Sequence, residues 1–455
     1  MSDLLGIGAS GVAAYSNMLS AIGNNVTNAS TPGYTRRSVT FAQNTSANAT
    51  SLYFTSRPEF SGVSTVAVTR SWNDYQAAVA RTAAGEAGRA DARATWLGNA
   101  QSALNDTATG VGQSATTFFS AGNALAADAG SSGNRQAFLN ALDQTASAFR
   151  STASALAQTS AGIATAAQTS VQTINSDLDA LDKVNASLNH QVAGSSAQAD
   201  LMDQRDRILD DLSSQIGINV KLDDSGVATV TLANASSIQL TASVGNNSSS
   251  QSPGTRFMLE QGDNGALQLS AVTAGKPQAI AAPGGELGGM VESAQTVADR
   301  RNSLNKMATD FVKSVNDWQA AGLNPAGTAG VPLLSGTDAA SITLTTNDPN
   351  AIAAASSTAS NGNLLNLSSL RGDSGLEKTW AGMITDQGQM VSAAQSENTA
   401  TSAASNSAFA ARDSLTGVDL NTEAGEMIRY QQAYSGAAKV IQVAKDTMQS
   451  IFDLF

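Results

Sequence analysis

The two ends of this chain carry apolar residues at the spacing of a coiled coil. The N-terminal heptad positions are Leu5, Val12, Leu19 and Val26 in one register and Gly8, Tyr15 and Ile22 in the other. The C-terminal positions are Met427, Tyr434, Ile441, Met448 and Phe455, interleaved with Tyr430, Ala437, Ala444 and Ile451. Residues that repeat in heptads lie on one face of a helix, so this pattern predicts two helices that pair from opposite ends of the chain.

Small residues within these ends weaken such a pair. The N-terminal segment contains Gly6, Gly8, Gly11 and Gly23, and each glycine costs a helix about 1 kcal/mol relative to alanine. Ala437 and Ala444 add little buried apolar area. We therefore hypothesise that both ends are frayed in the monomer and become ordered on assembly. The alternative is an ordinary intramolecular coiled coil that is already stable in the monomer.

A turn-forming segment follows the N-terminal helix. Its distinctive residues are Asn24, Asn25, Asn28, Thr31, Pro32, Gly33 and Tyr34. Asn and Thr favour caps and turns, and proline lacks the amide donor that a helix needs. The segment predicts that the first helix ends here and that a non-helical connector begins.

Between the ends the apolar period is mostly helical, with one interruption. Residues 74–212 and 290–318 repeat apolar side chains at helical intervals, and Gly110 and residues 130–133 divide the first block into separate helices. From Ile216 the period changes to two, which predicts a β-hairpin around the turn at residues 223–226 and a meander that ends at residues 283–285.

These patterns predict a mainly α fold with an inserted β domain. The expected parts are a terminal coiled-coil pair, a helical middle domain and one outer antiparallel β domain. Their expected boundaries are 1–35 with 415–455 for the terminal pair, 36–212 with 285–414 for the middle domain, and 213–284 for the β domain.

Composition narrows the classes of function. Only 14% of the residues are charged, against roughly 25% in ordinary soluble domains, which predicts smooth helical surfaces suited to side-by-side packing of subunits. An Ala-rich helical protein with no partner would share this composition. The net charge of −12 argues against nucleic acid as a partner, because a phosphate backbone needs clustered cations. The absence of cysteine excludes disulfides and thiolate chemistry.

The chain has no apolar run of ~20 residues, so we expect no membrane insertion. The first residues lack the basic and apolar regions of a secretory signal peptide. If the chain is exported, we expect a route that leaves its N-terminus uncleaved.

No motif predicts a catalytic, cofactor or metal site. Residues 6–11 spell G-x-G-x-x-G, but no strand precedes them, so close helix packing is the better interpretation. His190 is the only histidine and no G-x-S-x-G elbow accompanies it. The acidic residues of 203–211 alternate with Arg205 and Arg207, which we interpret as ordinary helix-surface charge.

Several segments resemble a known family. Residues 24–28 followed by residues 31–34 resemble the N-terminal signature shared by flagellar rod, hook and hook-associated proteins. Segments further along the chain resemble, more narrowly, the family of hook-associated protein 1, which forms the junction between hook and filament. These segments are residues 35–37, 203–212, 216–218, 284–289, 415–420 and 430–434.

The resemblance implies a structural, non-enzymatic subunit needed for filament assembly and motility, with its termini lining an inner tube and its β domain outside. It implies extracellular location in the bacterial flagellum, reached through type III export after a chaperone has bound near the C-terminal helix. It also implies a ring or helical array of identical subunits, with hook protein on one side and hook-associated protein 3 on the other.

Two departures from the family pattern stand out. The chain is short, leaving room for one outer domain where longer members carry two. The acidic run that usually precedes the last helix is diluted at residues 421–426, and Gly425 predicts that this helix starts late.

Two alternatives remain open. One is another axial protein, above all hook protein, which is mainly β outside its termini and is disfavoured by the helical block before residue 212. The other is a surface adhesin or enzyme that carries axial-type ends.

Overall fold

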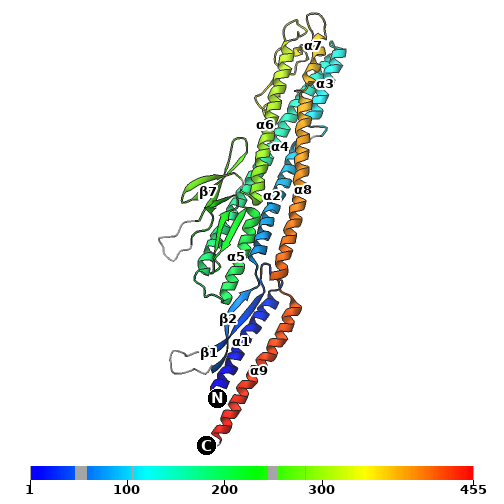
Figure 1. Cartoon of the computed structure of the whole chain (residues 1–455). Coiled ribbons are helices and arrows are strands. Elements are labelled where there is room, and N and C mark those ends of the chain that lie inside the picture. The colour runs from blue at the N-terminus through cyan, green and yellow to red at the C-terminus, as the bar shows by residue number, and fades with distance from the viewer. Residues whose placement is uncertain (1, 47–58, 105–106, 244–253, 282, 454–455) are drawn as a thin grey trace.

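The computed structural model describes residues 2–46, 59–104, 107–243, 254–281 and 283–453. The molecule is elongated, and the two ends of the chain lie together at one tip (Figure 1). The prediction of a mainly α fold with an inserted β domain is confirmed. Within the described ranges, no helix combines the length and the apolar character needed to cross a membrane.

Long helices form the body of the molecule and run along its length. This helical body consists of α2 (Asp74–Leu104), α3 (Val111–Ala127), α4 (Ser132–Leu188), α5 (Ser196–Gln215), α6 (Gly285–Ala320) and α8 (Leu376–Thr416). Helix α4 has 57 residues, which at 1.5 Å per residue span about 85 Å. Its start is fixed by Ser131, whose side chain accepts a hydrogen bond from the Asn134 amide.

Two apolar cores lie along the body. In the distal core, aromatic rings from three helices meet, with the Phe118 centroid 5.0 Å from that of Phe138 and 5.6 Å from that of Phe311. In the central core, the predicted α4 stripe of Ile174, Leu178 and Leu181 is fully buried against α5, α6 and the β domain. The helical period in the sequence therefore marked the buried faces of the body.

The β domain is built from two three-stranded antiparallel sheets. One contains β3 (Ile218–Leu222), β4 (Ala228–Leu232) and β5 (Ala235–Gln239), and the other contains β6 (Arg256–Gln261), β7 (Leu267–Thr273) and β8 (Lys276–Ile280). The predicted hairpin is confirmed, with Val220 opposite Val230. Strand β8 was not predicted, because its residues do not alternate between apolar and polar.

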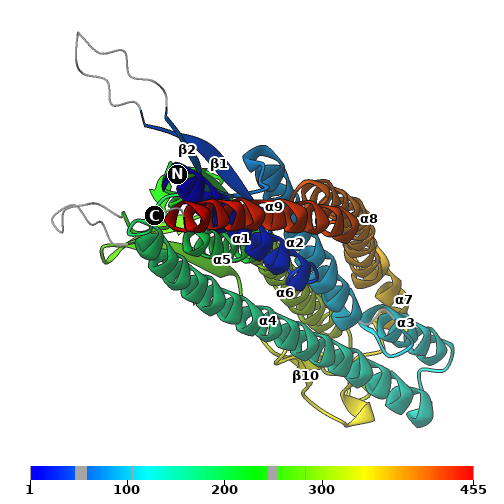
Figure 2. The same cartoon turned by 90° about the horizontal axis from the view of Figure 1, so that it is seen from below.

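The two chain ends form a separate terminal unit. Helix α1 (Ser2–Thr27) lies beside helix α9 (Leu420–Phe452), and the hairpin of β1 (Arg37–Ser46) and β2 (Glu59–Arg70) packs on α1 (Figures 1 and 2). The assignment of residues 37–70 to the helical middle domain was therefore wrong. Val39 and Phe41 alternate with polar residues and face the terminal helices together with Val68, which is the period of a half-buried strand.

The expectation that the last helix starts late was also wrong. Helix α9 begins at Leu420, because Asp419 caps it by accepting hydrogen bonds from the amides of Asn421 and Thr422. This cap stabilises the first turn although Gly425 follows it.

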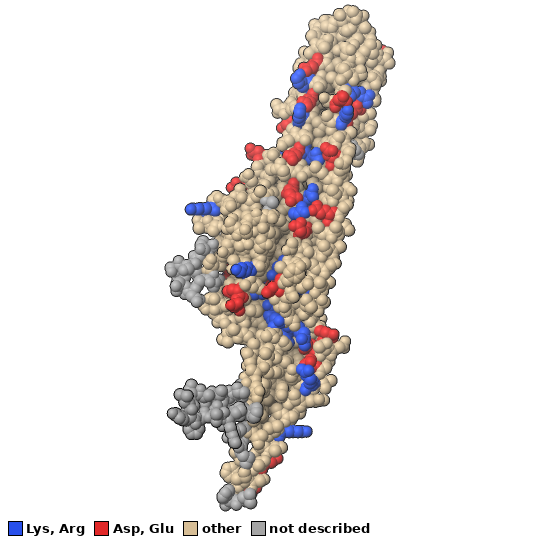
Figure 3. All heavy atoms as spheres, viewed as in Figure 1, with Lys and Arg blue, Asp and Glu red and all other residues tan. Residues whose placement is uncertain are grey.

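Short elements close the distal end of the body. They are β9 (Leu334–Ser335), β10 (Thr343–Leu344), η1 (Pro349–Ala351), α7 (Gly362–Leu365) and η2 (Asn366–Arg371). Much of the face seen in Figure 3 is uncharged, and many of its charged side chains lie in neighbouring pairs of opposite sign.

Candidate functional site

Glycines allow helices α1 and α9 to approach each other closely. A Cβ added at Gly8 would lie 2.7 Å from Ile441 Cγ1 and 3.3 Å from the Ala437 carbonyl oxygen, and one at Gly11 would lie 3.1 Å from Ala437 Cβ. A Cβ at Gly6 would meet nothing within 4 Å. Two glycines of the G-x-G-x-x-G segment thus serve close helix packing.

The predicted heptad residues differ in how they are placed. Ile22 is buried, and the half-buried ones are Val12, Tyr15, Leu19, Met427, Tyr430 and Ile441. The exposed ones are Leu5 (43%), Val26 (39%), Tyr434 (38%), Met448 (43%) and Ile451 (40%), and Phe455 lies outside the described residues. The register that faces α9 is therefore that of Gly8, Tyr15 and Ile22, and not that of Leu5 and Val26.

Three aromatic rings join the helix pair to the hairpin. The Tyr15 centroid lies 6.3 Å from that of Phe41 on β1 and 6.1 Å from that of Tyr430 on α9, and the last two are 6.4 Å apart. Ring contacts at this distance add to the area they bury. They fix α1, α9 and the hairpin as one unit.

Asn25 is the polar centre of the terminal unit. Its Nδ2 donates to the Arg37 carbonyl oxygen at 2.8 Å and to Glu423 Oε2 at 2.9 Å. Its Oδ1 accepts from the Arg37 amide at 2.9 Å and from the Tyr34 hydroxyl at 2.9 Å. Asn25 is fully buried, and both donors and both lone pairs of its amide are used. One side chain therefore joins α1, the connector, β1 and α9.

The partners of Asn25 are held by further polar contacts. Glu423 is fully buried and accepts a hydrogen bond from Arg36 Nε at 2.6 Å. Burial, opposed in part by the nearby Arg37, raises the pKa of Tyr34 to about 12. The Tyr34 hydroxyl consequently remains a donor at neutral pH.

The other signature residues shape the connector. Asn28 ends α1 by donating to the Asn24 carbonyl oxygen from both its amide and its side chain. The Thr31 amide donates to the Asn28 carbonyl oxygen at 2.9 Å, while Pro32 is exposed. Gly33 has a φ of 72°, and a Cβ there would lie 2.5 Å from Arg207 Cγ. The positive φ and the close approach of Arg207 both favour glycine at this position.

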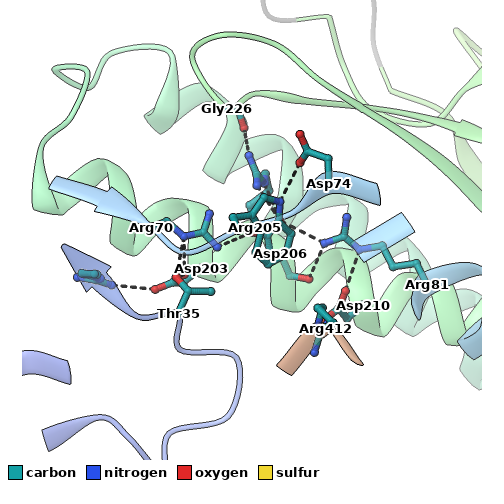
Figure 4. A network of polar contacts seen from close by, with 12 residues as sticks. Thr35, Arg70, Asp74, Arg81, Asp203, Arg205, Asp206, Asp210, Gly226 and Arg412 are labelled. Atoms are coloured by element: carbon teal, nitrogen blue, oxygen red, sulfur yellow. Dashed lines mark hydrogen bonds and ion pairs between the residues drawn. The ribbon is translucent and has the colours of Figure 1, made fainter. Parts of the chain in front are cut away.

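An alternating ladder of arginines and aspartates joins the terminal unit to the helical body (Figure 4). Arg37 bridges Asp200 at 2.7 Å and Asp203 at 2.8 Å. Arg70 bridges Asp203 at 2.8 Å and Asp206 at 2.6 Å. The ladder thus begins at the base of the β1–β2 hairpin and extends along one face of α5.

The ladder continues into the body. Arg81 of α2 bridges Asp206 at 3.2 Å and Asp210 at 2.8 Å. Arg412 of α8 bridges Asp210 at 2.5 Å and Asp413 at 3.0 Å. The consecutive elements β1, β2 and α2 and the distant helix α8 therefore meet on the acidic face of α5.

The interpretation of this acidic face as helix-surface charge was wrong. Asp203, Arg205 and Asp206 are buried, and Arg205 donates to Asp206 at 2.7 Å. Burial raises the pKa of Asp206, but the guanidinium groups of Arg205, Arg70 and Arg81 outweigh burial, so the pKa lies below its ordinary value. Asp206 is consequently ionised at neutral pH.

A buried ionic ladder fixes geometry more than it adds stability. Desolvation of the charges offsets most of their attraction, whereas removing one partner leaves another charge buried and costs about 3–5 kcal/mol. Among the residues that the structure describes, no group of His, Asp or Glu side chains is arranged to hold a metal ion. The site therefore positions two parts of the molecule relative to each other.

Comparison with known proteins places the chain first in a class and then in a family. Residues 414–454 match the C-terminal model of the flagellar basal body rod FlgEFG proteins, so α9 is of the axial flagellar class. Residues 97–334, more than half of the chain, match the flagellar hook-associated protein FlgK helical domain. The chain belongs to the flagellar hook-associated protein FlgK family.

Curated relatives agree with this family. The chain is 24% identical over 344 residues to flagellar hook-associated protein 1 of Salmonella typhimurium, covering 74% of this chain and 60% of the relative. It is 26% identical over 345 residues to the protein of the same name from Escherichia coli, covering 72% of this chain and 59% of the relative. The chain thus spans about 60% of the length of these curated relatives.

A solved structure shares the fold. The flagellar hook junction protein FlgK from Burkholderia pseudomallei aligns with a TM-score of 0.64 at 14% identity, covering 74% of this chain and 99% of that one.

Proposed function

We propose that this protein is a structural, non-enzymatic subunit of the bacterial flagellum that forms the junction zone between hook and filament. The observation that carries the proposal is the match of residues 97–334 to the hook-associated family. The terminal unit supports it, since paired chain ends joined rigidly to a helical body suit a subunit that repeats around a tube.

The proposed arrangement has nested layers. The inner layer is the coiled-coil pair of residues 1–35 and 415–455, now extended by the β1–β2 hairpin. The shell is the helical body, and residues 213–284 form the outer β domain. The ladder on α5 sets the angle between inner layer and shell, because Arg37 and Arg70 of the terminal unit contact Asp203 of the body.

The proposed partners follow from this position. Identical copies form a ring or helical array, hook protein lies on one side, and hook-associated protein 3 lies on the other. A flagellar export chaperone binds at α9 before export, where Ile428 and Val443 expose apolar side chains. The protein is extracellular and lies in the flagellum, which it reaches through type III export.

A second candidate is hook protein or another axial protein, favoured by the match of residues 414–454 to a rod-protein model. The long helices α2 and α4 disfavour hook protein, which is mainly β outside its termini. Deletion of the gene in the native organism, followed by microscopy, separates the two. We expect hooks without filaments and flagellin lost to the medium; intact filaments or missing hooks would refute the junction assignment.

A further inference from the structure

Helix α5 contacts the terminal unit on one side and the β domain on the other. On the terminal side it holds the base of the β1–β2 hairpin through Arg70. On the other side the β3–β4 turn, residues 223–226, packs against it, and a Cβ added at Gly226 would lie 2.4 Å from Met202 Cε. The turn is fixed internally by Asp223, whose Oδ1 accepts hydrogen bonds from two amides of the same loop. Helix α5 therefore lies between two elements that belong to different parts of the molecule.

One series of hydrogen bonds crosses the first turn of α5 from the hairpin to the β domain. The Val68 amide of β2 donates to the Gly194 carbonyl oxygen at 2.8 Å, and the Gly194 amide donates to Gln198 Oε1 at 2.8 Å. The other end of the same side chain, Gln198 Nε2, donates to the Ser225 carbonyl oxygen at 3.1 Å. Gln198 is buried. We call this series the glutamine relay, because one side-chain amide connects the hairpin to the turn.

A second series crosses α5 about two turns further on. Arg70 Nη2 of β2 donates to Asp206 Oδ2 at 2.6 Å, and Arg205 Nη2 donates to Oδ1 of the same carboxylate at 2.7 Å. Arg205 Nη1 also donates to the Gly226 carbonyl oxygen (Figure 4). Arg205 is 1% exposed, so the loss of either contact leaves a buried donor unsatisfied, which is costly. We call this series the arginine relay.

The two relays begin and end at neighbouring positions. Val68 and Arg70 are two residues apart on β2, and Ser225 and Gly226 are adjacent in the turn. Each relay depends on a buried α5 side chain that contacts both sides. When the hairpin leaves α5, each of these side chains loses a partner that helps to hold it against the turn. Buried polar groups linked in this way strengthen or weaken one another.

We propose that α5 makes the β1–β2 hairpin and the β3–β4 turn one cooperative unit, in which the turn of the outer β domain loosens whenever the hairpin of the terminal unit leaves α5. Local opening spreads through the relays because a buried polar group that has lost one partner regains it from water only when its surroundings open too. The coupling is reciprocal, so the turn affects the hairpin by the same factor. It is a property of the isolated chain and does not rest on the proposed flagellar function.

Native-state amide exchange on the full chain at low urea concentration tests whether hairpin and turn open together. The reporters are the Val68 amide in the hairpin and the Gly226 amide in the turn, which donates to the Asp223 carbonyl oxygen at 3.0 Å. We expect the equilibrium constants of opening of the two amides to agree within about threefold and to rise together with urea, as they do within one cooperative unit. A larger difference between the two constants, in either direction, would overturn the proposal.

A substitution in the turn should be detected in the hairpin. G226A places a Cβ against Met202 and displaces the turn, and we expect it to raise the opening constant of the Val68 amide about tenfold. The opening constant of the Leu139 amide, inside α4 in the distal core, should not change.

The matched control is G275A, in another turn of the β domain. Gly275 has a φ of 78°, against 85° at Gly226, but a Cβ at Gly275 would meet nothing within 4 Å. Both substitutions therefore strain the backbone, and only G226A displaces a contact with α5. G275A should leave the opening constant of the Val68 amide unchanged. An equal effect of the two variants, or no effect of G226A, would overturn the proposal.

A milder variant keeps the test decisive if G226A does not fold. Q198E retains the acceptor for the Gly194 amide and loses only the donor that faces the Ser225 carbonyl oxygen. Since a carboxylate is a stronger acceptor than an amide, the local effect of Q198E on the hairpin side is to increase protection. The proposal predicts the opposite, an opening constant of the Val68 amide that rises about threefold or more. Q204E adds the same charge at an exposed position of α5 and should not change this constant. An unchanged or lower constant in Q198E would contradict the coupling.

Discussion

Asn25 Nδ2 lies 2.9 Å from Glu423 Oε2 and joins residues 398 positions apart in the sequence. This hydrogen bond connects the first helix of the chain to the last. Both groups are fully buried, so the bond forms only when the two chain ends have come together. A residue of the N-terminal signature thus holds the two terminal helices together.

Replacing Asn25 with alanine should loosen the terminal unit. The change leaves Glu423 with one partner fewer and removes the acceptor of the Tyr34 hydroxyl. We expect the free energy of opening of α9 in the assembled array, measured by amide exchange, to fall by about 2–4 kcal/mol. N24A, at the exposed neighbouring position, should change it by less than about 0.5 kcal/mol. Equal effects of N24A and N25A would show that Asn25 is not the polar centre.

Gly33 should tolerate alanine less well than a glycine of similar backbone conformation. Gly33 has a φ of 72° and Gly327 a φ of 77°, but an added Cβ would clash only at Gly33, against Arg207. Both substitutions cost about 1 kcal/mol through backbone strain. G33A should lower the free energy of unfolding by about 1 kcal/mol more than G327A. If urea titrations showed that G33A and G327A lower the free energy of unfolding equally, the contact with Arg207 would not contribute.

Alanine at Gly8 should separate the terminal helices, whereas alanine at Gly6 should not. A Cβ added at Gly8 would lie 2.7 Å from Ile441 Cγ1, whereas one added at Gly6 would meet nothing within 4 Å. We expect G8A to abolish assembly. G6A should still assemble, because alanine stabilises the helix by about 1 kcal/mol relative to glycine and meets no neighbour at this position.

The ordering of the chain ends on assembly is a separate prediction. Amide exchange of residues 5–26 should show weak protection in the native monomer and strong protection after assembly. Strong protection in the monomer would contradict ordering on assembly.

The ladder should weaken in acid. Because the folded-state pKa of Asp206 lies below its unfolded value of 3.8, its contribution is fully present above about pH 5 and is lost as pH falls through the folded pKa. D206N should cost about 3–5 kcal/mol at pH 7, and this difference should shrink below about pH 4. Urea titrations between pH 7 and pH 3 measure this difference in the free energy of unfolding, and D224N, at an exposed turn, is the control. A difference that does not change with pH would contradict the claim that the ionised Asp206 carboxylate stabilises the fold.

Local periodicity predicted the elements well and the long-range contacts poorly. The stripes of α4 and α6 and the hairpin at Val220 followed from spacing alone, since each element buries one face. Spacing gave two registers for α1 and could not tell which one faces α9, because Gly8 and Gly11 face α9 for their small size, whereas apolar Leu5 and Val26 do not. A search for apolar heptad residues does not detect positions where glycine is needed for close helix packing.

The ladder could not be predicted from α5. Asp203, Asp206 and Asp210 occupy one helical face, which is equally typical of a solvated surface. Their partners are Arg37, Arg70, Arg81 and Arg412, and only the tertiary fold brings these together. The β1–β2 hairpin was detectable in principle, since Val39 and Phe41 alternate with polar residues.

The most direct test of the proposed function is the position of the protein on intact flagella. Immunogold labelling with an antibody against the exposed β domain, followed by electron microscopy, should place gold in one narrow zone between hook and filament. The deletion strain should carry none. Gold along the whole filament, along the hook or on the cell body would contradict a junction subunit.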